Sequence, residues 1–123
     1  MPLCLAAGAV TAALAVESFT LAWTHSIEKL RWEEDWRIEA KTLVITEARI
    51  RGTGAGMEPP ADAVLKEGIW HYRPAVKPLT NLRLSHSPYT VGYELCIEGE
   101  CRPLAEHLPG AENLTTIVLE ACP

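Results

Sequence analysis

Hydrophobic and polar residues alternate along much of the chain, and this pattern predicts strands. In residues 19–27 the large apolar side chains and one histidine occupy every second position. Residues 31–39 repeat the alternation with a more polar, charged outer face, and residues 42–51 follow at once as a third expected strand. A period of two is typical of strands with one buried face. We therefore expect a three-stranded antiparallel meander over residues 19–51.

The rest of the chain also predicts strands, and no segment has a sustained helical period. Short runs rich in apolar and β-branched residues occur near both ends and in the second half. Residues 52–60 are rich in Gly and Pro and are expected to form an irregular loop after the meander. The additional expected strands cover residues 3–7, 10–16, 69–73, 82–86, 89–97 and 114–121.

Length and composition fit one small domain. The chain has 123 residues, of which 48% are hydrophobic, enough for one packed core and too few for two. Together with the strand pattern, this predicts a single all-β domain over residues 1–123, an antiparallel meander that forms a small sandwich or a partly open barrel. A net charge of −5 without a basic run argues against binding to nucleic acids or anionic membranes.

The apolar N-terminal stretch, residues 1–16, allows two interpretations. It ends near an Ala-Leu-Ala triplet that resembles a signal-peptidase site. It has no Lys or Arg before the apolar residues, and it is too short to span a membrane. Gly8 divides it into halves of strand length, so we favour two strands over a signal peptide and expect no transmembrane segment. A turn at Glu17-Ser18 would then continue the chain into the meander.

Four cysteines are placed so that two disulfides are possible. Cys96 and Cys101 flank an expected two-residue turn, which would set them opposite each other on paired strands. Cys4 and Cys122 lie near the chain ends, which often lie close together in a domain. Disulfides would favour a periplasmic or exported protein; reduced thiols would suit the cytoplasm, if the N-terminus is a strand and no export signal precedes it. No Cys-x-x-Cys or Cys-His knuckle supports a zinc site.

The register implied by the expected turns brings three ionisable residues together. A turn at residues 29–30 pairs His25 with Glu34, and a turn at residues 40–41 pairs Glu34 with Glu47. All three would then lie in one row, on the face that carries the tryptophans. Neighbouring strands are about 4.8 Å apart, so the tips of these side chains could converge. This row is the candidate site.

Three interpretations of the row remain open. The carboxylates could be solvated at the sheet edge, with His25 a satisfied, half-buried histidine. The row could bind a ligand or a partner. One His with two carboxylates is also a familiar metal-ligand set, and an acid–base enzyme could use the same groups. The adjacent Ser26 points to the other face and so is not paired with His25 as a hydrolase nucleophile. The alternating glycines of residues 52–56 precede no helix, so we expect no nucleotide site and no cofactor.

A string of short motifs resembles a known family. The string contains HSIEK at residues 25–29, then Glu34, Glu47 and Gly-Ala-Gly-Met at residues 54–57. It resembles the uncharacterised bacterial family called domain of unknown function 1850, in which the corresponding strings read HSVEK and GAGLP. The resemblance covers the first half of the chain strongly and the rest loosely.

This resemblance implies an accessory role near solute uptake. Members are often encoded beside tripartite ATP-independent periplasmic (TRAP) transporters of the TAXI type, and many carry an N-terminal export or membrane segment that is not evident in this chain. The resemblance implies a binding protein whose partner is a TRAP component or a small solute, and it supplies no known activity. A small metal-dependent or acid–base enzyme that uses the His/Glu/Glu row is the alternative. The candidate binding residues are His25, Ser26, Glu28, Glu34, Glu47, Gly54, Gly56 and Met57.

Overall fold

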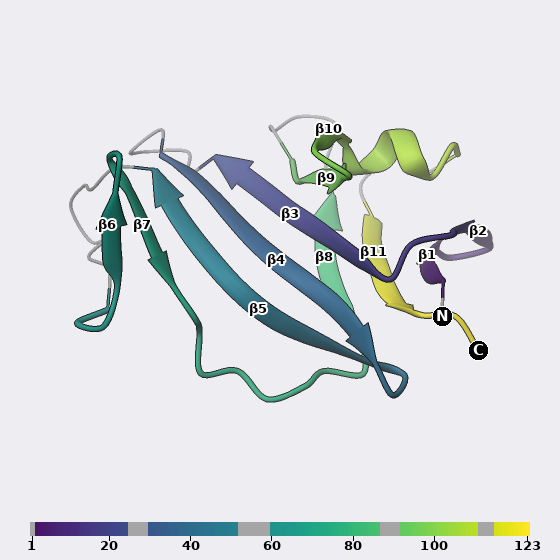
Figure 1. Cartoon of the computed structure of the whole chain (residues 1–123). Coiled ribbons are helices and arrows are strands. Elements are labelled where there is room, and N and C mark those ends of the chain that lie inside the picture. The colour runs from purple at the N-terminus through teal and green to yellow at the C-terminus, as the bar shows by residue number, and fades with distance from the viewer. Residues whose placement is uncertain (1, 25–29, 52–59, 87–91, 111–114) are drawn as a thin grey trace.

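The chain folds into two antiparallel sheets that face each other, and neither closes into a barrel (Figure 1). The computed structural model describes residues 2–24, 30–51, 60–86, 92–110 and 115–123. This arrangement confirms the all-β prediction and selects the sandwich over the partly open barrel. None of the described helical segments has the length and hydrophobicity needed to cross a membrane.

The smaller sheet has four strands in the order β2-β1-β11-β8, and all its neighbouring strands are antiparallel. Its two central strands come from opposite ends of the chain, so the N- and C-terminal strands lie side by side (Figure 1). The strands are β1 (Leu3–Ala7), β2 (Val10–Leu14), β8 (Leu82–His86) and β11 (Thr115–Ala121).

The larger sheet has seven strands in the order β10-β9-β3-β4-β5-β7-β6. Its centre is the predicted meander, in which β3 pairs with β4 and β4 with β5. The elements are β3 (Ser18–Thr24), β4 (Arg31–Glu39), β5 (Thr42–Arg51), β6 (Val64–Lys66), β7 (Ile69–Tyr72), β9 (Glu94–Ile97), β10 (Glu100–Pro103) and the 3-10 turn η1 (Leu104–His107).

The hydrophobic core lies between the two sheets. Leu5 and Leu119 contribute from the smaller sheet, and Leu21, Ile45 and Leu95 contribute from the larger one, all of them buried. Each occupies one of the alternate positions of its strand that carry apolar side chains. The alternation that predicted the strands therefore also predicted which side chains are buried. We call the core-facing side of the larger sheet its inner face and the opposite side its outer face.

The chain changes sheets between β2 and β3, which corrects the expectation that a turn at Glu17-Ser18 simply continues the meander. β2 pairs only with β1 in the smaller sheet, whereas β3 pairs with β4 and β9 in the larger one. The carbonyl of Glu17 accepts a hydrogen bond from the N–H of Ile38 at 2.8 Å, which holds the crossing segment against β4. Side-chain alternation does not reveal to which layer a strand belongs, because strands of both layers share the same period.

Both predicted disulfides are present. Cys96 and Cys101 lie directly opposite each other on β9 and β10, next to the turn that joins these strands. Cys4 of β1 is bonded to Cys122, which follows β11. Every cysteine of the chain is therefore paired.

Candidate functional site

The register between β3 and β4 differs from the predicted one. Thr24 at the end of β3 pairs with Arg31 at the start of β4. Glu34 consequently lies opposite Leu21, and its predicted pairing with His25 is wrong. The alternation of side chains defines the faces of a strand, but it does not determine which residues of the next strand lie opposite.

A β-bulge changes the register between β4 and β5. Trp36 pairs with Ile45, as predicted, but the next pair is Asp35 with Glu47. Thr46 is the extra residue at this point. An inserted residue turns every later side chain of its strand to the other face of the sheet.

Glu34 and Glu47 therefore lie on opposite faces of the larger sheet. Glu34 pairs with Ala48 on the inner face, and Glu47 lies beside Asp35 on the outer face. The predicted row of His25, Glu34 and Glu47 therefore does not form. Because the two carboxylates lie on opposite faces of the sheet, they cannot act together in a metal or acid–base site. Within the described part of the chain, no group of three or more His, Cys, Asp or Glu side chains is placed to hold a metal ion.

Glu34 lies among apolar side chains on the inner face. Its cross-strand neighbours Leu21 and Ala48 are buried. Burial raises the pKa of the Glu34 carboxyl; the Trp36 indole partly opposes this, although its N–H makes no hydrogen bond of standard geometry. Burial, together with the charge of Glu34, also raises the pKa of Tyr72. An ionised carboxylate in this position costs stability, and a residue with such a perturbed pKa is a candidate for function.

Aromatic side chains gather at the same end of the inner face. Trp23 and Trp32 stack with ring centroids 6.0 Å apart, and Tyr93 packs edge-on against Trp23 with centroids 5.7 Å apart. Trp36 is 4% exposed and lies in the core. These contacts assign Trp23, Trp32 and Trp36 to packing.

The outer face carries a network of ion pairs centred on Glu33. The Glu33 carboxylate is almost fully buried and accepts hydrogen bonds from Nε of Arg31 and Nε of Arg49, each at 3.2 Å. Nη2 of Arg51 also lies 3.2 Å from it. Burial raises the pKa of Glu33, but the hydrogen bonds from Arg49 and Arg31 and the charge of Arg51 lower it more, so this pKa lies below its ordinary value. Glu33 thus remains ionised and fully paired at neutral pH.

Asp35 is held by a two-pronged contact with Arg49. Nη1 and Nη2 of Arg49 each lie 2.7 Å from one of the two Asp35 carboxylate oxygens, and the Thr20 hydroxyl donates a further bond at 2.7 Å. The hydrogen bond from Arg49 is the main reason that the pKa of Asp35 lies below its ordinary value. Nη1 of Arg49 also approaches Glu47 at 3.4 Å, and Glu47 contacts Nδ1 of His71. Paired contacts of this kind fix side-chain geometry as well as charge.

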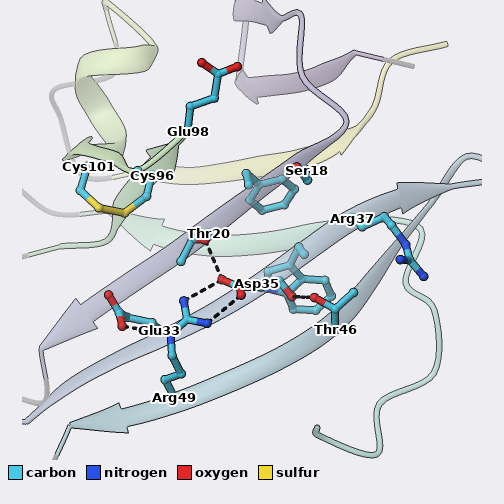
Figure 2. Close-up of a pocket in the computed structure, with 13 residues that line it drawn as sticks. Ser18, Thr20, Glu33, Asp35, Arg37, Thr46, Arg49, Cys96, Glu98 and Cys101 are labelled. Carbon is cyan, nitrogen blue, oxygen red and sulfur yellow. Dashed lines mark hydrogen bonds and ion pairs between the residues drawn. A yellow bond between two sulfur atoms is a disulfide. The ribbon is translucent and has the colours of Figure 1, made fainter. Parts of the chain in front are cut away.

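An open pocket of about 600 Å³ lies over this part of the outer face. Figure 2 shows Thr20, Asp35 and Arg49 converging on its floor, with the Cys96–Cys101 disulfide at one side. The volume is within the range of small-molecule sites. Residues with polar groups in the lining include Ser18, Thr20, Asp35, Thr46, Arg49 and Glu98.

The same network joins the strand ends to which the family-like motifs are attached. Arg31 begins β4, just after residues 25–29, and Arg51 ends β5, just before residues 52–59. Both arginines contact Glu33, so this one carboxylate fixes the places where both segments leave the sheet. The predicted site residues that lie outside the described part of the chain are His25, Ser26, Glu28, Gly54, Gly56 and Met57.

Three residues of this site were not among those predicted from the sequence, namely Glu33, Asp35 and Arg49. Acidic residues occupy alternate positions of β4, and arginines occupy alternate positions of β5. This pattern could have indicated the site, because opposite charges on neighbouring strands form cross-strand pairs. Alternation alone predicts only a solvated face at these positions.

Comparison with known proteins supports the resemblance noted in the sequence. Residues 19–104 match the model of a family described as Domain of unknown function (DUF1850). No curated protein and no solved structure matches the chain. The family match spans the central meander, the outer-face network and the cysteine hairpin. Because it covers more than half of the chain, this protein belongs to the DUF1850 family.

Proposed function

We propose that this protein is a binding protein without catalytic chemistry of its own, and that it serves a TRAP-type solute uptake system as an accessory component. The observation that carries this proposal is the open pocket of about 600 Å³ with a floor of Thr20, Asp35 and Arg49. These groups already hold one another in place. A preformed site binds more tightly because fewer side chains must be ordered when the ligand arrives.

The pairing of charges on the pocket floor indicates what kind of ligand suits it. The Arg49 guanidinium and the Asp35 carboxylate offset each other, and Thr20 donates to the same carboxylate. The floor thus offers directed hydrogen-bonding groups with little uncompensated charge. This favours a polar solute, or a polar side chain of a partner protein, over a strongly charged one.

We place the contact with the transporter component at the motif-bearing end of the larger sheet. The Glu33 network fixes the strand ends there. Glu47, on the outer face, belongs to this network because Arg49 contacts both Glu33 and Glu47. Glu34 contributes from the inner face, where its burial costs stability and therefore favours a role other than folding. The other proposed contact residues are His25, Ser26, Glu28, Gly54, Gly56 and Met57.

The TRAP partner rests on the family resemblance, and the proposed periplasmic or exported location rests on that resemblance together with the cysteines. Two disulfides that use every cysteine suit an oxidising compartment.

Affinity capture of purified TRAP-transporter components by the tagged protein tests this proposal. The native protein should retain a component, and Asp35→Asn should weaken retention about tenfold, because a hydrogen bond to a charged group contributes roughly 1.5–3 kcal/mol. Asp62→Asn, at an exposed position in the segment before β6, is the matched control and should behave like the native protein. Glu34→Ala should also weaken capture, whereas His25→Ala should remain folded by circular dichroism.

Failure of the native protein to capture any transporter component would contradict the accessory role. Equal capture by Asp35→Asn and Asp62→Asn would show that the pocket takes no part. Thermal shift with a panel of small polar solutes tests the pocket separately, because a ligand that binds only the folded state raises the melting temperature.

A further inference from the structure

The four edge strands of the two sheets differ in how they are protected against pairing with other chains. β6 has only three residues and ends in Lys66, β10 carries Arg102 and Pro103, and β8 carries the exposed Arg83. Short length, charge and Pro are common devices that keep an edge strand unpaired. β2 reads Val-Thr-Ala-Ala-Leu and has neither a charged residue nor a Pro. It is the one edge among these strands that lacks such protection.

The backbone of β2 has hydrogen-bonding groups directed away from its own sheet. Ala7 and Val10 close a two-residue turn between β1 and β2, and the closing pair of such a hairpin exchanges backbone hydrogen bonds. Bonded and non-bonded pairs then alternate along an antiparallel ladder. The N–H and C=O groups of Thr11 and Ala13 therefore point away from β1, and no strand in the described part of the chain pairs with them.

The core-facing side chains of β2 leave some apolar surface accessible at this edge. Val10, Ala12 and Leu14 pack against the core but are only partly buried. Gly110 lies close to Val10, and a further strand beside β2 would remove part of the remaining apolar surface from water. Thr11 and Ala13 face away from the core and are exposed.

We propose that β2 pairs with β2 of a second copy of this chain, antiparallel about a two-fold axis at Ala12. In this register Thr11 faces Ala13 of the partner subunit, and the two residues exchange backbone hydrogen bonds. The two-fold axis creates the same pair a second time. The available groups of β2 are thus complementary to those of a second β2, and because neither copy carries a charge or a Pro on this strand, nothing opposes their close approach.

This pairing joins the two smaller sheets of a dimer into one continuous sheet. The outer-face pocket is lined by residues around the larger sheet and contains no residue of β2. Dimer formation therefore leaves the pocket open in each copy, and this inference stands or falls independently of the proposed ligand and transporter partner.

Sedimentation equilibrium of the full chain over a wide concentration range tests the proposal with a matched pair of variants. The native protein should show a monomer–dimer equilibrium. Thr11→Lys/Ala13→Lys places Lys opposite Lys twice across the two-fold axis and should raise the dimer dissociation constant about tenfold or more. Thr11→Lys/Ala13→Glu places Lys opposite Glu twice and should dimerise at least as tightly as the native protein.

Both variants change only exposed side chains, and thermal unfolding should confirm that each is folded. High salt should reduce the difference between them, because it screens exposed charges. A native protein that stays monomeric at every concentration would overturn the proposal. A dimer that both variants weaken equally, or that neither affects, would overturn it as well, because such a dimer does not use this strand in this register.

Discussion

The adjacent residues Glu33 and Glu34 have opposite effects on stability because a strand directs them to opposite faces. Three arginines surround Glu33 on the outer face, and its pKa lies below the ordinary value. Glu34 is half-buried on the inner face, and its pKa lies above the ordinary value. A lowered carboxyl pKa means that the folded state favours the ionised form, and a raised pKa means that it disfavours that form.

Replacement of each glutamate by glutamine should therefore change stability in opposite directions at pH 7. Glu33→Gln leaves arginines without their carboxylate and should lower the free energy of unfolding by about 2 kcal/mol. Glu34→Gln removes a charge that the inner face disfavours and should raise it modestly. Urea denaturation measures both. Glu39→Gln, which disrupts only an exposed pair with Arg37, is the control and should change stability by less than about 1 kcal/mol.

The pH dependence of the two variants follows from the direction of each pKa shift. The contribution of Glu33 is present above its ordinary pKa of 4.5 and is lost as the pH falls through its lower folded value. The destabilisation by Glu34 is absent below 4.5, grows as the pH rises from there towards its raised folded value, and is complete above that value. Both differences from the native protein should thus shrink in acid. A loss of stability in Glu34→Gln at pH 7 would contradict this account.

At the scale of elements, the turn between β4 and β5 contains a local strain that can be removed. Ala40 and Lys41 both have positive φ, 49° and 66°, a conformation that disfavours residues with a Cβ and suits Asn-Gly. Ala40→Asn/Lys41→Gly should raise the free energy of unfolding by about 1 kcal/mol, measured by urea denaturation.

The control for this turn is Ala40→Val, which places a β-branched residue at a positive φ and should destabilise the protein. If the Asn-Gly variant proves less stable than the native protein, the conformation of the turn is not the one described.

The sequence predicts most strands because alternation and short turns are local properties. Register depends on the number of residues between strands, and the observed pairing departs from the prediction at two places, between β3 and β4 and at the bulge at Thr46. The bulge did leave a signal. The apolar positions of β5 shift by one place between Ile45 and Ala48, which is the change that an inserted residue produces.

The candidate site was predictable only in part for the same reason. The motifs indicated the end of the sheet at which residues 25–29 and 52–59 attach. The predicted pairing of Glu34 with Glu47, however, assumed a regular strand ladder without a bulge. Glu33 owes its importance to arginines from two strands. Such partners cannot be identified until the register is known.

At the scale of the whole molecule, the two disulfides should contribute unequally to stability. Cys4 and Cys122 are 118 residues apart, whereas Cys96 and Cys101 are 5 apart. A longer closed loop restricts the unfolded chain more. Cys4→Ala/Cys122→Ala should therefore lower the free energy of unfolding by about 4–5 kcal/mol, and Cys96→Ala/Cys101→Ala by about 2 kcal/mol.

Urea denaturation without reductant measures this difference, and thiol titration of each unfolded variant confirms that the remaining disulfide is intact. An equal or greater loss from the short-loop pair would contradict the argument. It would mean that the hairpin bond acts mainly by holding the folded wall of the pocket.

The bond between Cys4 and Cys122 has a topological consequence. It connects residues that are 118 positions apart, so residues 4–122 form a covalent ring. A single protease nick in an exposed turn, such as the one at Glu67 and Gly68, opens that ring but releases no fragment. Under non-reducing conditions the cleaved protein keeps its original mass apart from one added water, and only a reductant separates the two pieces.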